Sequence, residues 1–180
     1  MNAGALIEDD ATLNEIVRAM RTVAVLGIKD GRDPDTPAFT IPSLLVEDGV
    51  RLIGVNPVVK EALGSPTLPS LAELPAGVDV LDVFRRSDAI PGIADELLAL
   101  PPAQRPAVVW LQTGIRHDEA AARLVAAGYR VVRTAASACT PAAPAARTED
   151  LGGGLTRTDA LAILRPHSHR GARAPRRRRT

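Results

Sequence analysis

The chain has 180 residues, of which 46% are apolar and 2% aromatic, and its formal net charge is +1. This length and composition suit one soluble globular domain with an aliphatic core, and no run approaches the roughly 20 apolar residues that a membrane-spanning helix needs. The single cysteine, Cys139, excludes an intrachain disulfide and a thiolate metal cluster. Together with an N-terminus that shows no signal-peptide pattern, it leads us to expect a cytoplasmic protein.

Apolar spacing predicts an amphipathic helix over Ala5–Met20, with Thr12 as a candidate cap. In chain order we then expect a strand at Val23–Leu26, a helix at Ala38–Asp48, a strand at Arg51–Val55, an irregular segment at Val58–Pro69, a short helical turn at Ser70–Leu74, a strand at Val78–Phe84, a helix at Ala89–Leu100, a strand at Ala107–Leu111, a helix at Asp118–Ala127 and a strand at Tyr129–Val132. This alternation predicts an α/β fold with a doubly wound, mostly parallel, five-stranded Rossmann-like sheet.

Two helix boundaries depend on individual residues. Pro42 suits the first turn of a helix, so the second helix begins either at Ala38 or nearer Ile41. Ser87 is a candidate N-cap for the helix Ala89–Leu100.

Four turns follow the carboxyl ends of the strands, so we expect them at one edge of the sheet, where such folds bind ligands. They are Gly27–Arg32, Asn56–Pro57, Phe84–Arg86 and Gln112–Gly114. An apolar strand that stops at a glycine before a cationic loop is typical of a phosphate site. The cations of these turns are Lys29, Arg32, Arg85 and Arg86. Their convergence predicts a polyphosphate ligand, because charge-assisted hydrogen bonds to phosphate are stronger than neutral ones.

A nicotinamide dinucleotide is one candidate ligand, but its fingerprint is incomplete. The motif Gly-x-Gly-x-x-Gly should follow the first strand, whereas here the next glycine after Gly27 is Gly31. An acid should follow the second strand, where this chain has Asn56-Pro57. A Walker loop is excluded because no Gly-Lys-Ser/Thr follows at the required spacing. The incomplete glycine motif and the missing acid weaken the dinucleotide interpretation.

Four segments occur in an order and spacing that point to a known family. They are Ala24–Gly27, Gly54–Pro57, Val80–Arg86 and Val109–Ile115. Together they resemble the small CoA-binding family of stand-alone Rossmann-like domains, similar to the CoA-binding domain of the succinyl-CoA synthetase α subunit. The resemblance implies coenzyme A or an acyl-CoA as the ligand. It also implies binding without catalysis, because the synthetase's phosphorylated histidine belongs to a separate domain.

The resemblance assigns the CoA phosphates to the first turn, the walls of the nucleotide crevice to the second and third, and its far side to the fourth. Ile28 replaces the small or hydroxylic residue often found there, so backbone N–H groups are expected to hold the phosphates. The complete set of expected ligand contacts is Gly27, Ile28, Lys29, Arg32, Asn56, Pro57, Phe84, Arg85, Arg86, Gln112, Thr113 and Gly114.

Simpler interpretations remain open for several residues. The four cations can be solvated surface charges, and Asn56-Pro57 can be a turn without any contact to a ligand. Trp110 is expected in the core and His117 at a helix start, whereas Asp79 and Asp82 are explained by the solvated side of one strand. No Ser/His/Asp set or carboxylate pair predicts catalysis. The functional alternatives are an NAD(P)-type oxidoreductase module and an acyl-CoA enzyme.

The two ends of the chain differ in charge. Residues 1–132 hold 12 Lys/Arg and 18 Asp/Glu, whereas residues 133–180 hold 10 and 3. We therefore expect a CoA-binding domain over 1–132 and a low-complexity basic tail over 133–180, with low order from about Ala135. The run Arg176–Arg179 predicts only nonspecific contact with nucleic acid. The oligomeric state and the acyl group stay open.

The family usually continues after Val132 with Asp-Arg-Cys-Leu, and the codons from Arg133 onward can spell this motif when they are read one nucleotide earlier. We therefore expect a frameshift near Arg133 that replaced the native end; a genuine disordered extension is the alternative. Resequencing of the coding DNA tests this expectation, and a frame-restored protein should melt at a higher temperature. The expectation fails when no single-base shift recovers the motif.

Overall fold

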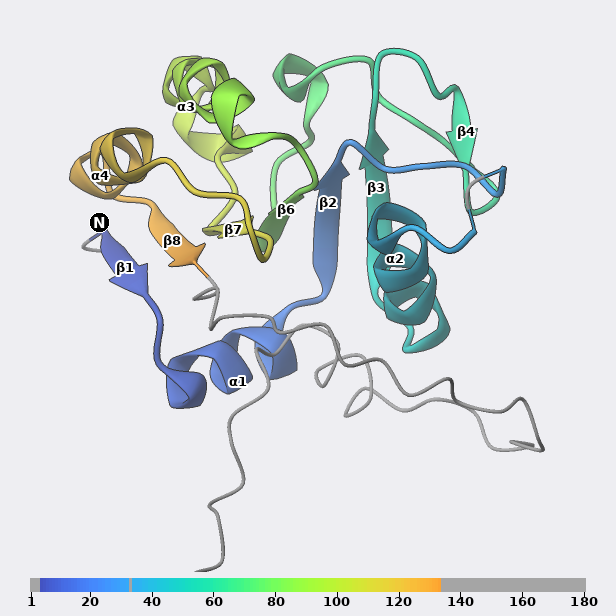
Figure 1. The fold of residues 1–180 in the computed structure, drawn as a ribbon, viewed down its shortest axis with the longest axis horizontal. Helices are drawn as coiled ribbons and strands as arrows, with labels where there is room; N and C mark the ends of the chain where they lie inside the picture. The colour runs from blue at the N-terminus through green and yellow to red at the C-terminus, as the bar shows by residue number, and fades with distance from the viewer. Residues whose placement is uncertain (1–3, 33, 134–180) are drawn as a thin grey trace, which may run out of the picture.

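Six strands pair in parallel to form the centre of the fold (Figure 1). The computed structural model describes residues 4–32 and 34–133. The strands are β1 (Ala5–Ile7), β2 (Thr22–Leu26), β3 (Arg51–Val55), β6 (Val80–Val83), β7 (Val108–Leu111) and β8 (Arg130–Arg133), in the spatial order β1-β8-β7-β6-β2-β3. All residues of β6 and β7 are buried, as expected for central strands covered on both faces.

Helices cover both faces of the sheet. They are α1 (Asp10–Ala19), α2 (Pro37–Glu47), α3 (Ile90–Ala99) and α4 (Asp118–Ala126), with 3-10 turns at Leu71–Glu73, Ser87–Ala89 and Pro102–Gln104. Ile16 of α1 and Ile41 of α2 belong to one hydrophobic cluster, and Ile93 of α3 and Leu124 of α4 belong to another. Figure 1 shows α3 and α4 together on one side of the sheet and α1 on the other. The α/β, doubly wound fold class is therefore confirmed.

The strand order reverses between β2 and β6. From β2 the chain passes through α2 to the edge strand β3, and it then returns across β2 to β6, β7 and β8. In open parallel sheets such a switch point leaves a crevice at the carboxyl ends of the two strands. Leu26 and Val83, which pair in the β2–β6 register, mark this position.

The N-terminal segment differs from the expected single helix. Ala5–Ile7 forms the sixth strand, paired with β8, and the helix begins only after Asp9. Asp9, not Thr12, is the cap, since its carboxylate accepts the Thr12 N–H at 2.8 Å. Pairing with a strand more than 120 residues away overrides the local helical spacing.

The start of α2, the cap of α3 and the segment after β3 also differ from the sequence-based expectations. The helix α2 begins at Pro37, so the alternative start near Ile41 was wrong. Ser87 does not cap α3, whose N-cap is Ala89. The hydroxyl of Ser87 instead accepts the Arg116 N–H at 3.0 Å. The segment expected to be irregular contains an antiparallel hairpin of β4 (Glu61–Ala62) and β5 (Ser65–Pro66).

The predicted basic tail lies outside the described residues except for Arg133, which ends β8 and pairs with Glu8 and Asp118. Within the described part of the chain, no helix is long and apolar enough to cross a membrane.

Candidate functional site

Gly27 joins three strands at the switch point. Its N–H donates to the Val55 carbonyl of β3 at 2.9 Å, and the Phe84 N–H donates to the Leu26 carbonyl at 2.9 Å. Its φ of +91° is a conformation that favours glycine. A Cβ at this position would lie 2.4 Å from the Phe84 carbonyl oxygen. Glycine is therefore required by both the backbone conformation and the close approach of the loop after β6.

Arg85 lies directly over this junction. Its Nε is 3.3 Å from the position that a Cβ on Gly27 would occupy, and its side chain is half-buried. The residue lines clefts on both sides of the carboxyl edge. It therefore places a fixed positive charge at the centre of the switch point.

The larger cleft, here called the α2-side cleft, has a volume of about 530 Å³. Its walls are the N-terminal turn of α2 and the turns after β6 and β7. The lining residues are Thr36, Pro37, Ala38, Ile41, Phe84, Arg85, Arg86, Gln112, Thr113, Gly114 and Ile115. The N-terminus of α2 faces this cleft, and the first turn of the helix carries no acidic residue that would offset the positive end of its dipole.

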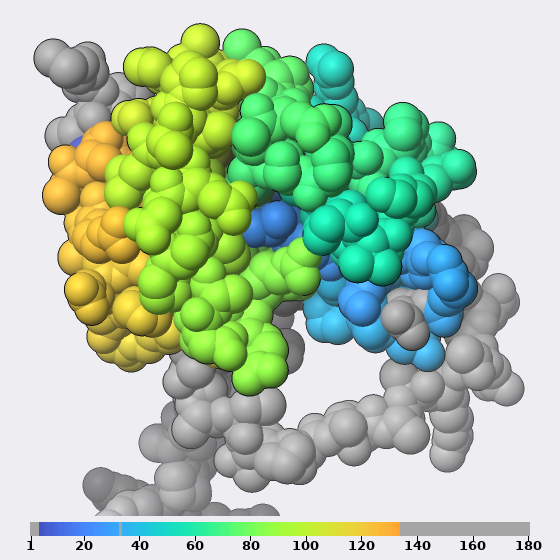
Figure 2. Space-filling model, turned by 90° about the horizontal axis from the view of Figure 1, so that it is seen from above, coloured from blue at the N-terminus to red at the C-terminus, as the bar shows by residue number. Residues whose placement is uncertain are grey.

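The smaller cleft, here called the α3-side cleft, has a volume of about 310 Å³ and lies on the opposite face of the sheet. It is lined by Leu26, Pro57, Pro69, Ser70, Leu71, Arg85, Ala89, Gly92, Ile93 and Glu96. Figure 2 looks down on this edge and shows blue atoms from the end of β2 recessed between the green α3 region and the teal segment that follows β3. The two clefts meet at Arg85.

Two expected contacts turn inward. The Ile28 side chain is fully buried in the core, and its carbonyl accepts the Asn56 Nδ2–H at 2.8 Å. The Asn56 Oδ1 accepts the N–H groups of Val58 at 2.9 Å and Val59 at 3.3 Å. Asn56 thus holds the loops after β2 and β3 together, and only Pro57 of this turn lines a cleft.

Two of the expected cations lie outside both clefts. Arg32 is 88% exposed and pairs with Asp30 at 2.9 Å, and Lys29 is exposed. The N–H of Lys29 donates to the Ala38 carbonyl at 3.1 Å. With the Gly27 N–H bonded to β3, this leaves little room for the expected backbone contacts to phosphate at these two residues. In place of Lys29 and Arg32, the α2-side cleft brings the turn Phe84–Arg86 together with the turn Gln112–Gly114.

The buried acid Asp82, which we expected on a solvated side of its strand, pairs with Gln112, a lining residue of the α2-side cleft. The Gln112 Nε2–H donates to Asp82 Oδ1 at 2.8 Å. Burial raises the pKa of Asp82 from 3.8 to about 7, although hydrogen bonds from Gln112 and the Val83 backbone oppose this change. The solvated side expected for Asp82 does not exist, because helices cover both faces of β6. A lone acid within an otherwise apolar central strand was the signal for this pair.

The remaining sequence interpretations concern structural residues. Trp110 is buried, as expected, and His117 is the N-cap of α4, where its Nδ1 accepts the Ala120 N–H at 3.2 Å. Asp79 precedes β6 and accepts the N–H groups of Arg21 and Thr22. Over residues 4–32 and 34–133, no cluster of His, Cys, Asp and Glu is suited to hold a metal ion.

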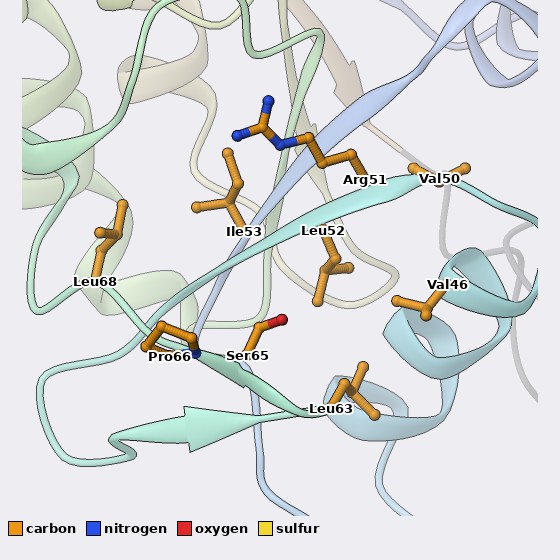
Figure 3. A pocket seen from close by; sticks show the side chains of 9 residues that line it. All are labelled: Val46, Val50, Arg51, Leu52, Ile53, Leu63, Ser65, Pro66 and Leu68. Atoms are coloured by element: carbon orange, nitrogen blue, oxygen red, sulfur yellow. The ribbon is translucent and has the colours of Figure 1, made fainter.

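A third hollow, the β3-edge cavity, lies along the outer strand and away from the switch point. It has a volume of about 400 Å³ and lies between β3, the end of α2 and the β4–β5 hairpin. Figure 3 shows Leu52 extending from β3 toward α2 and the hairpin, whereas Arg51 and Ile53 extend to the other side. Its lining is mainly aliphatic, with Arg51 as the single cation among the lining residues, whereas two arginines line the α2-side cleft.

Comparison with known proteins gives a consistent family. The CoA binding domain family matches residues 21–139. The uncharacterised protein YneT of Bacillus subtilis (strain 168) is 34% identical over 122 residues, which are 68% of this chain and 86% of YneT. Among solved structures, cell-free ID.343 from Thermus thermophilus is 40% identical with a TM-score of 0.62, over 69% of this chain and 90% of that one. Prb, the PH1109 protein redesigned for binding, is 25% identical with a TM-score of 0.63, over 70% and 84% of the two chains. The chain belongs to the CoA binding domain family.

Proposed function

We propose that this protein binds coenzyme A or an acyl-CoA at the carboxyl edge of the sheet, across the α2-side and α3-side clefts, and that it does so without catalysing a reaction on the ligand. The observation that carries the proposal is the position of Arg85. This side chain lies over Gly27 at the switch point and borders both clefts. Family membership supports CoA as the ligand class.

Side chains and a helix terminus are the expected phosphate contacts. The N–H groups of Gly27 and Lys29 already bond within the protein. The guanidinium of Arg85 and the N-terminus of α2 both face the α2-side cleft, and each attracts anions. The diphosphate of CoA is therefore assigned to this region, with Arg86 as an outer cation that also pairs with Asp88 at 3.2 Å.

The two clefts also suit the shape of CoA. This ligand is long, with a nucleotide at one end, a diphosphate between, and a pantetheine arm that ends in a thiol. Volumes of about 530 and 310 Å³ fall within or near the range of small-molecule sites. Clefts that meet at a single arginine allow one ligand to occupy both while its charged middle lies at Arg85.

The proposal for a binding role rests on the chemistry of the cleft walls. The polar side chains of the α2-side cleft are those of arginine, glutamine and threonine, which bind and orient a ligand. We place this binding protein in the cytoplasm, where its single cysteine stays reduced. The domain boundary after residue 132 is likewise a proposal.

Arg85→Ala is expected to weaken CoA binding by about 10- to 100-fold, because a charge-assisted hydrogen bond contributes about 1.5–3 kcal/mol. Isothermal titration calorimetry of the full chain with CoA measures this change. Arg51→Ala is the matched control, since it removes an exposed arginine at the β3 edge. Equal CoA affinities for the two variants would contradict the proposed site, and tighter binding of NAD or NADP than of CoA would contradict the ligand class.

A further inference from the structure

Three polar side chains lie together on the face of the sheet that α1 and α2 cover. Asp82 of β6 and Trp110 of β7 are register partners, and Gln112 follows Trp110 by two residues. All three are buried, with exposed fractions of 4%, 3% and 8% respectively. Asp82 accepts the Gln112 Nε2–H at 2.8 Å, and within the described residues the Trp110 Nε1–H has no hydrogen-bond partner. Buried polar groups are normally satisfied; Asp82 and Gln112 satisfy each other, and the Trp110 Nε1–H beside them is the exception.

The chemistry of the pair determines what Gln112 can offer to a ligand. An ionised carboxylate only accepts hydrogen bonds, so it requires an N–H of the Gln112 amide and leaves the Oε1 acceptor for other partners. A protonated carboxyl group can donate, which permits the reversed amide with its N–H groups turned outward. Gln112 also lines the α2-side cleft, so the orientation of its amide determines whether this residue presents a hydrogen-bond acceptor or hydrogen-bond donors to the cleft.

We propose that Asp82 is a positioning residue that acts through Gln112 to determine which hydrogen-bonding group the α2-side cleft presents to its ligand. Ionised Asp82 holds the Gln112 amide with its carbonyl oxygen available to an N–H donor, such as the exocyclic amine or an amide of CoA. Protonated Asp82 releases this orientation. The proposal rests on the CoA-binding function proposed above for the identity of the ligand, but the Asp82–Gln112 coupling can be measured without ligand.

Burial, Gln112 and the Val83 backbone determine the protonation of Asp82, because no charged side chain among the described residues faces it closely. The neighbouring strands β2 and β7 carry no charged side chain. The charged residues of the helices on this face are Asp10, Glu15, Arg18 and Glu47, and all are exposed. Of the nearby loop cations, Arg85 is half-buried over Gly27, whereas Lys29 and Arg86 are exposed. A pKa of about 7 then places the change between the two amide orientations near neutral pH.

Trp110 makes this coupling directly measurable, because it is the single tryptophan of the chain. The fluorescence of unliganded protein, excited selectively at tryptophan, should titrate with a midpoint near pH 7. Asp82→Asn should remove this transition, and Gln112→Met should move its midpoint upward because the ionised form loses a hydrogen bond. Glu15→Gln, an exposed carboxyl-to-amide change on α1, should leave it unchanged. No transition in the wild type, or one that persists in Asp82→Asn, would overturn the proposal.

Calorimetry with CoA at pH 6 and pH 8 tests the effect on binding. The phosphate of CoA titrates in this range for every variant, so the comparison is the ratio of the two Kd values. The Kd at pH 6 divided by the Kd at pH 8 should be about fivefold larger in the wild type than in Asp82→Asn, because ionised Asp82 lets Gln112 accept one hydrogen bond from the ligand at pH 8. Gln112→Met should match Asp82→Asn. Identical ratios in wild type and Asp82→Asn would overturn the inference, whereas absence of CoA binding by the wild type would refute the proposed function and leave the fluorescence result to decide the coupling.

Discussion

Replacing Gly27 with alanine is expected to lower the free energy of unfolding by about 3 kcal/mol and to abolish measurable CoA binding. The left-handed backbone conformation costs about 1–2 kcal/mol for a residue with a Cβ. The new methyl group would also lie 2.4 Å from the Phe84 carbonyl oxygen, and forced overpacking of this kind costs about 1–3 kcal/mol. The loop after β6, and Arg85 with it, must move to relieve this contact. Urea denaturation measures the stability and calorimetry the binding.

Gly77→Ala separates the two contributions. Gly77 has a similar φ of +82°, but an added Cβ there meets nothing within 4 Å. This variant should lose only the conformational part, about 1–2 kcal/mol, and should bind CoA normally. Equal losses of stability in the two alanine variants, with CoA binding retained in both, would show that the close approach of β2 and the loop after β6 does not shape the site.

Asp82→Asn is expected to stabilise the protein at pH 8 by up to about 4 kcal/mol. The pKa of Asp82 is raised from 3.8 to about 7 by burial, so between these values the folded state holds a proton that the unfolded chain has released. Stability therefore falls as the pH rises from about 4 to 7, and above pH 7 the full cost of burying the charge is present. Asparagine carries no such charge.

Urea denaturation at pH 5 and pH 8 measures this difference. The advantage of the variant should be small at pH 5, about 1–2 kcal/mol, because this pH is only about one unit above the unfolded pKa of 3.8, and it should reach its full value at pH 8. Glu15→Gln controls for the loss of an exposed carboxylate and should follow the wild type at both values. A variant that is less stable than the wild type at pH 8 would mean that the ionised Asp82–Gln112 pair stabilises the fold.

The arrangement of the turns could be predicted because parallel strands end at one edge. Buried apolar runs predict β2, β6 and β7, and the rule that ligands bind at the carboxyl edge predicts that Gly27, Arg85 and Gln112 lie near one another. The direction of a loop is not determined in this way. Arg32 was expected at the ligand because of its charge, yet the structure pairs it with Asp30 on the surface.

What the sequence could not show depends on contacts between distant segments. The local spacing places Ile7 in a helix, but pairing with β8 makes it part of a strand. Asp82 and Gln112 are 30 residues apart, and their hydrogen bond exists only because β6 and β7 are neighbours in the sheet. Asn56 likewise reads as a turn residue, although its amide bonds the Ile28 carbonyl across two loops. In each case the deciding contact comes from a segment that is distant in the sequence: for Ile7 it changes the element itself, and for Asp82, Gln112 and Asn56 it sets the role of the side chain.

A titration of the ¹⁵N-labelled full chain with CoA, followed by two-dimensional NMR, tests the central claim most directly. Binding across the two clefts predicts progressive changes in the amide signals of Gly27, Arg85, Gln112 and Gly114. The signals of Leu52 and Leu63 at the β3-edge cavity should remain unchanged and serve as the internal reference. Unchanged signals at the carboxyl edge under saturating CoA, or changes confined to the β3-edge cavity, would contradict the proposed site.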